Sequence, residues 1–148
     1  MYQHILASID GGELSLRAGR KAIELAKALN ARLSGVMVCP TFQQLADKGY
    51  FPPTLDVDRS LWEQGIAGRA RAILGRFEAL AASEGVVCGT VLVVDDDPYH
   101  SIIAAAQDNG CDLIVMGSHG YGRVKQWLLG SQTTQVLSHS TIPVLVFR

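Results

Sequence analysis

Short apolar runs, rich in valine, isoleucine and leucine, recur along the chain. They span Gln3–Ile9, Arg32–Cys39, Val86–Val94, Asp112–Met116 and Pro143–Phe147. Most of these runs lack the polar–apolar alternation of a strand with one face in water. Continuous apolar runs of this length are typical of strands that are buried on both faces of a parallel sheet. The pattern therefore predicts five parallel strands.

The segments between these runs carry apolar residues at three- and four-residue spacing, which is the period of an amphipathic helix. The spacing predicts helices over about residues 13–30, 58–83, 97–110 and 131–139. Asp58 and Asp97 are the expected N-caps of the second and third helices, and Pro98 suits a first helical position. Strands that alternate with such helices predict right-handed crossovers and a doubly wound α/β sheet with helices on both faces.

The stretch Pro40–Val57 fits neither period. It holds three prolines and a glycine beside Phe42, Tyr50 and Phe51. Prolines and glycines in this density interrupt helices and strands. We therefore expect a long surface loop with some packing of its own.

Composition indicates one globular domain over residues 1–148. Of these residues 48% are hydrophobic and 18% charged, and the formal net charge is −1. Without a run of lysines or arginines, this balance argues against binding to nucleic acid or to a membrane surface. No signal peptide or membrane-spanning run is visible. The separated cysteines, which lack CxxC spacing, suit reduced thiols, so we expect a cytoplasmic protein.

The densest candidate for chemistry is the glycine-rich segment Gly117-Ser118-His119-Gly120, followed later by Gly130-Ser131. Glycine lets backbone N–H groups converge on an anion, and a helix that starts at Ser131 adds unpaired donors and a positive dipole end. This predicts a phosphate cradle. On its own, the pattern fits a glycine-rich surface turn equally well, because it is neither a Walker A motif nor a GxGxxG fingerprint.

Asp10 adds a second feature, because it stands at the end of the first predicted strand. Ligands of open α/β sheets bind outside the carboxyl ends of the strands, where the strand order reverses. An aspartate there can accept from a ribose hydroxyl while a glycine loop at another strand end holds phosphates. The alternative is that Asp10 only caps the following turn or helix. Asp95-Asp96-Asp97 is a weaker candidate for a metal site, since adjacent carboxylates point in different directions.

The run Ile5-Leu6-Ala7-Ser8-Ile9-Asp10-Gly11 resembles the start of universal stress proteins. The spacing of Gly117, Gly120 and Gly130-Ser131 matches the ATP-binding signature G-2x-G-9x-G-S of that family. The resemblance extends over nearly the whole chain, with Pro40–Val57 as the least similar part. It implies a single-domain, Rossmann-like fold of the adenine nucleotide alpha hydrolase type. The implied strand order is 3-2-1-4-5, with the first and fourth strands side by side.

The resemblance also implies roles for individual residues. Asp10 would hold the adenosine end, the backbone of Val38 would meet the adenine edge, and Met116 would pack near the base or sugar. Ser8, another implied nucleotide-binding position, stands where the family often has proline. The ribose and phosphates would be lined by Gly117, Gly120, Gly130, Ser131, Gln132 and Thr133.

The resemblance implies an ATP-binding stress regulator or sensor, with AMP or ADP as other possible ligands. It also implies a homodimer that pairs through the edge strand at residues 143–147. Mg²⁺ or Mn²⁺ would arrive with the phosphates rather than in a protein cage. No general base is evident beside the cradle, so at most slow ATP hydrolysis is expected. The alternatives are a slow ATPase and an interaction module that does not use nucleotides.

Overall fold

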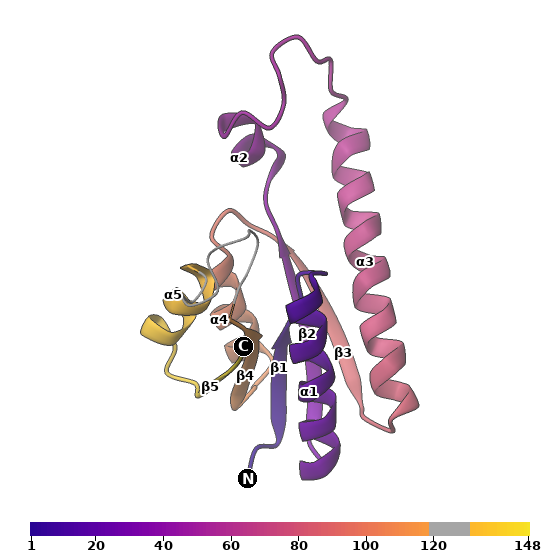
Figure 1. The fold of residues 1–148 in the computed structure, drawn as a ribbon, viewed down its shortest axis with the longest axis vertical. Helices are drawn as coiled ribbons and strands as arrows, with labels where there is room; N and C mark the ends of the chain where they lie inside the picture. The colour runs from indigo at the N-terminus through magenta and orange to yellow at the C-terminus, as the bar shows by residue number, and fades with distance from the viewer. Residues whose placement is uncertain (119–130) are drawn as a thin grey trace.

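The computed structural model describes residues 1–118 and 131–148, so predictions for residues 119–130 lie outside the described residues. The strands form one five-stranded sheet of order β3-β2-β1-β4-β5 (Figure 1). Every neighbouring pair is parallel. The strands are β1 (His4–Ser8), β2 (Arg32–Cys39), β3 (Cys88–Val94), β4 (Leu113–Gly117) and β5 (Val144–Phe147). This confirms the predicted fold class and strand order.

Two helices cover each face of the sheet. One face carries α1 (Glu13–Leu29) and α3 (Arg59–Ser83), and the other carries α4 (Pro98–Asp108) and α5 (Ser131–His139). Successive residues of β1 serve opposite faces: Ile5 packs with α1 and α3, whereas Leu6 packs with α4 and α5. Both side chains are fully buried. This explains why the strands have continuous apolar runs rather than alternation.

The helix boundaries confirm most of the predicted capping. Asp58 accepts the N–H of Leu61 at 3.1 Å and so caps α3. Gly85 and Gly110 follow α3 and α4 with positive φ angles of 76° and 66°, which suits the residue after a helix. Asp97 occupies the N-cap position of α4, but its side chain makes no capping hydrogen bond. The prediction that Asp97 takes the N-cap position, with Pro98 at the first helical position, is therefore confirmed.

The segment expected as a loop between residues 40 and 57 contains a short helix, α2 (Phe42–Asp47). Thr41 caps it by accepting the N–H of Gln44 at 3.1 Å. The rings of Phe42 and Phe51 stack at 4.7 Å, and both meet Trp62 of α3 edge-on. This aromatic cluster (Phe42, Phe51, Trp62) gives the segment a small core of its own. The expectation of packing was right, but the helix was missed.

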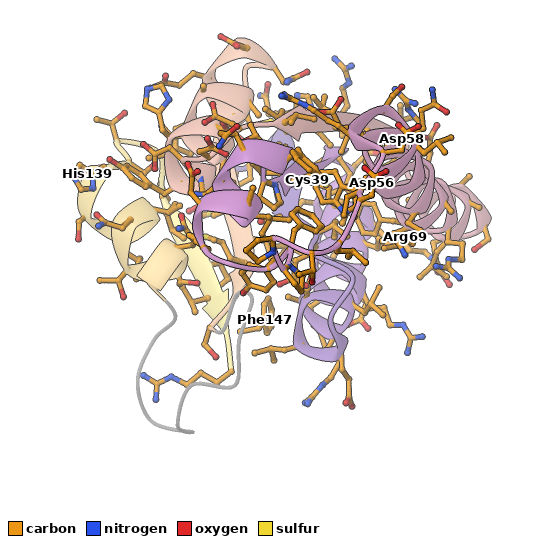
Figure 2. The ribbon with its side chains drawn as sticks, turned by 90° about the horizontal axis from the view of Figure 1, so that it is seen from above. Cys39, Asp56, Asp58, Arg69, His139 and Phe147 are labelled. Carbon is orange, nitrogen blue, oxygen red and sulfur yellow. The ribbon has the colours of Figure 1, made fainter. Side chains whose placement is uncertain are left out.

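The aromatic cluster lies beyond the carboxyl edge of the sheet. The upper part of α3 and the whole of α2 extend above the strands in Figure 1. Seen from above in Figure 2, Cys39, the last residue of β2, lies beside α2, while Asp56 and Asp58 lie where the chain enters α3. Although α3 has 25 residues, neither it nor another helix in the described ranges is long and apolar enough to cross a membrane.

A buried histidine lies at the opposite, amino edge of the sheet. His4 is 8% exposed, and its Nε2 lies 2.8 Å from the hydroxyl of Ser34. Burial and the nearby charge of Arg32 lower the pKa of His4 below its ordinary value of 6.5, although the Asn109 carbonyl and Asp112 oppose this shift. The folded state therefore favours the neutral ring more strongly than the unfolded state does.

This arrangement predicts a pH dependence of stability. Above pH 6.5 the ring is neutral in both states and its contribution is fully present. As the pH falls below that value, the unfolded chain takes up the proton first, so the free energy of unfolding should decrease. Urea titrations between about pH 7.5 and pH 5.5 should show this loss, and H4Q should reduce it. The exposed His139 supplies a control, H139Q, and an equal pH slope in H4Q and the parent would contradict this assignment.

Candidate functional site

A pocket opens at the carboxyl edge of the sheet, between the ends of β1, β2 and β4 and the starts of three helices. It is lined by Ser8, Ile9, Asp10, Ser15, Val38, Pro98, Ile102, Met116, Gly117, Gln132 and Thr133. The residues predicted from the sequence that meet here are Ser8, Asp10, Val38, Met116, Gly117, Gln132 and Thr133. Gly120 and Gly130 lie outside the described residues, and Ser131 begins α5.

One end of the pocket is apolar. Val38 and Met116 reach it from the ends of β2 and β4, and Ile102 reaches it from α4. All three belong to the core between the sheet and the α4–α5 layer and are at most 5% exposed. Pro98, at the start of α4, also lines the pocket. A wall of this kind suits a flat, uncharged ring system.

Asp10 forms the tight turn between β1 and α1. One carboxylate oxygen accepts the N–H of Gly12 at 2.7 Å, and the backbone N–H of Asp10 donates to the hydroxyl of Ser15 at 2.9 Å. The Ser15 hydroxyl in turn lies 3.4 Å from the carbonyl of Ser8. The interpretation that Asp10 caps the local turn is therefore correct for one oxygen. In the described ranges, its second oxygen has no hydrogen-bond partner and can accept from a ligand.

Thr133 and Gly117 join α5 to the end of β4. The hydroxyl of Thr133, which is 1% exposed, donates to the carbonyl of Gly117 at 2.9 Å. A Cβ at Gly117 would lie 3.1 Å from Cγ of Leu14, so a larger residue at this position would press against the side chain of Leu14 in α1. The family resemblance implied that both residues line the ribose and phosphates. The structure brings both to the pocket, but it also gives them packing and hydrogen-bonding roles that the sequence did not indicate.

Gln132 connects the starts of α5 and α4. Its side-chain oxygen accepts the N–H of Tyr99 at 2.8 Å, so it satisfies one of the donors left unpaired at the start of α4. Ser15, Pro98 and Gln132 belong to the first turns of α1, α4 and α5, so three helix N-termini meet at the pocket. Because each N-terminus carries a partial positive charge, this end of the pocket favours an anion.

Comparison with known proteins identifies the family of this chain. The model of the Universal stress protein family matches residues 1–148. The chain belongs to the universal stress protein family. It is similar to universal stress protein YxiE of Bacillus subtilis, with 32% identity over 154 aligned residues and 100% of both chains covered.

Solved structures of the family superpose on this fold. Universal stress protein UspA from Lactobacillus plantarum is 25% identical, with a TM-score of 0.82 over 99% of this chain and 98% of the other. A universal stress protein described as a complex with cAMP is 26% identical, with a TM-score of 0.68 over 99% of this chain and 97% of the other. The strand order implied by the family resemblance is the order observed here.

Asp95 and Asp96, two of the aspartates considered as metal ligands, accept hydrogen bonds that hold the local structure of this universal stress protein. Asp95 accepts the N–H of Asp97 and the hydroxyl of Ser101, both at 2.9 Å. These hydrogen bonds lower the pKa of Asp95. Asp96 accepts from the N–H and hydroxyl of Thr41 at 3.0 and 2.7 Å and so ties α2 to the start of α4. Across residues 1–118 and 131–148, no three His, Cys, Asp or Glu side chains gather as metal ligands.

The cysteine side chains do not supply a nucleophile to the pocket. All three are free thiols, and Cys39 and Cys111 are buried. Burial, with the charge of Glu78, raises the pKa of Cys88 to about 11. Burial, with the charge of Asp112, raises that of Cys111 to about 11, and burial also raises the pKa of Cys39. These thiols are protonated near neutral pH and therefore weakly nucleophilic.

Proposed function

We propose that this universal stress protein binds an adenine nucleotide, ATP foremost, and acts as a nucleotide-dependent stress regulator or sensor. The observation that carries the proposal is the pocket itself, which has an apolar wall, an available carboxylate oxygen and converging helix N-termini. These features match a base, a ribose and a phosphate group in turn. Support also comes from the family structure described as a complex with cAMP.

Each part of the nucleotide has a counterpart in the pocket. The adenine would lie against Val38, Ile102 and Met116, and a ribose hydroxyl would donate to Asp10. The phosphates would lie between the end of β4, where the glycine signature of residues 117–131 begins, and the start of α5, where it ends. Any Mg²⁺ or Mn²⁺ would be held mainly by phosphate oxygens, because Asp10 is the only ionisable side chain among the described pocket residues.

We favour binding over catalysis. Hydrolysis of ATP needs a group that positions or deprotonates the attacking water. Among the described pocket residues, the single ionisable side chain is Asp10, which already accepts from Gly12 and faces the proposed ribose position. A slow ATPase is the alternative, and turnover well above once per minute would favour it. A module that does not use nucleotides is the other alternative, and it predicts that no nucleotide binds.

A thermal melt tests the proposed function without a label. A ligand that binds only the folded state at 100 times its Kd stabilises that state by about 2.7 kcal/mol. For a chain of this length, saturating ATP should raise the Tm by about 5 °C or more. GTP at the same concentration is the matched control and should give a smaller shift. Equal shifts with ATP and GTP would argue for unspecific phosphate binding instead.

We further propose a cytoplasmic homodimer that pairs through β5, which is hydrogen-bonded to β4 on one side only. The free thiols support the location, and the unpaired edge supports the dimer. Sedimentation should give about twice the chain mass of 15.9 kDa. The substitution L145D, at a residue 39% exposed on β5, should shift the protein to monomer. The control V87D, at an exposed site next to the opposite edge strand, should leave the dimer intact, and a monomeric parent would contradict the proposal.

A further inference from the structure

The segment that leaves β2 and the segment that enters α4 are joined by a latch, which we define as Asp96 with Thr41 and Gln44. The Asp96 carboxylate accepts the N–H and the hydroxyl of Thr41 at 3.0 and 2.7 Å, and its backbone carbonyl accepts the side-chain amide of Gln44 at 3.0 Å. One residue earlier, the N–H of Asp95 donates to the carbonyl of Cys39 at 3.0 Å. These hydrogen bonds fix the start of α2 against the start of α4.

The arm, which we define as residues 41–57, is held to the rest of the fold by the latch and by the aromatic cluster. Its helix α2 is six residues long and contains no buried residue. A segment with so little buried surface opens locally at a fraction of the free energy of global unfolding. We therefore expect a docked state of the arm to exchange with a locally open one.

The two segments that the latch joins also form part of the pocket. Val38 directly precedes Cys39, and Pro98 lies two residues after Asp96; both line the pocket, as does Ile102 of α4. An adenine ring placed against Val38 and Ile102, as proposed above, would contact β2 and α4 at once. The ligand and the latch would thus stabilise the same juxtaposition. A ligand with such a preference shifts the population toward the docked arm.

We propose that occupation of the pocket by a nucleotide is coupled to the arm through Asp96, so that the bound protein keeps the arm docked and the free protein releases it more often. This inference rests on the proposed function and supplies its output: the state of the pocket is reported at the aromatic cluster. Such coupling is reciprocal. If the nucleotide favours the docked arm by a given factor, the docked arm raises nucleotide affinity by the same factor.

Hydrogen exchange of the full chain, followed by mass spectrometry, tests the coupling. The reporters are backbone N–H groups that donate within the arm, those of Leu45, Lys48 and Tyr50. Saturating ATP should slow their exchange about fivefold, which is the lower end of couplings between sites. The N–H of Gly85, which is exposed and follows the far end of α3, is the internal control and should exchange at an unchanged rate.

The substitution D96A tests the latch itself, because it removes the carboxylate that accepts from Thr41. Without ligand, the reporters should exchange faster than in the parent. The effect of ATP on them should fall below about twofold, and calorimetry should show ATP binding weakened about threefold. The matched control is D47A, since Asp47 accepts from the Gln43 side chain within α2 at 2.7 Å. This variant should keep the parental ATP effect and affinity.

The outcomes separate this inference from the proposed function. ATP binding in the parent that leaves the reporters unchanged would overturn the coupling, while the proposed function would stand. An ATP effect of equal size in D96A and the parent would overturn the assignment to Asp96. If calorimetry shows no binding of ATP to the parent, the proposed function and the coupling both fail.

Discussion

Replacing Asp10 with alanine should weaken the binding of ATP and of adenosine alike, by about 100-fold. The substitution removes the oxygen that we assign to the ribose. It also removes the 2.7 Å hydrogen bond to Gly12 that holds the turn between β1 and α1. Because both ligands contain the ribose, their affinities should fall together. Titration calorimetry well below the Tm measures both affinities.

A matched control exists at the other edge of the sheet. Asp112 also accepts backbone N–H groups, from Gln3 at 2.9 Å and from His4 at 3.0 Å, but it lies at the amino end of β4. The substitution D112N should change stability and leave nucleotide affinity unaltered. If D10A binds nucleotide as tightly as the parent does, Asp10 only stabilises the turn between β1 and α1 and does not contact the ligand. An equal loss of affinity in D112N would attribute the D10A effect to general destabilisation.

Replacing Gly35 with valine should lower the free energy of unfolding by about 3 kcal/mol. Gly35 lies in the middle of β2 under the ring of Phe77 from α3. A Cβ at this position would lie 2.9 and 3.0 Å from two ring carbons, closer than packed atoms allow. The ring is 5% exposed and cannot swing into solvent without opening the core. Urea unfolding, with the slope of the transition as a check on cooperativity, measures the loss.

A double substitution tests the cause. F77A alone should cost about 3–5 kcal/mol, because it leaves a cavity beneath α3. In the double variant G35V/F77A, the valine occupies part of that cavity. The double variant should therefore be more stable than the sum of the two single losses predicts, by at least about 1 kcal/mol. Strict additivity would show that the two residues do not compete for the same space.

The strands could be predicted because the apolar runs of the three central strands, β1, β2 and β4, are buried between two helical layers. The prediction of Arg32–Cys39 matches β2 residue for residue, and Leu33–Cys39 is buried throughout. The order of the strands in the sheet could not be predicted in this way, because periodicity carries no information on which strands are neighbours. It came from the family resemblance, through the pattern around Asp10 and the glycine spacing after Met116.

The misses arose where a tertiary contact decides the local structure. The helix α2 depends on Phe42 meeting Phe51 and Trp62, which is distant in sequence. At the start of α4, Asp97 takes the predicted N-cap position, but the hydrogen bonds to this turn come from the side chains of Asp95 and Gln132, which the local pattern did not indicate. A prediction based on neighbouring residues could assign Gln132 to a ligand, but could not show that its oxygen serves Tyr99.

Calorimetric titration of the full chain with ATP, beside a matched titration with GTP, tests the central claim most directly. We expect saturable heat with ATP at a submillimolar Kd and markedly weaker binding of GTP. We also expect D10A to remove the ATP signal under the same conditions. Absence of heat with every adenine nucleotide would contradict the claim that this pocket is a nucleotide site.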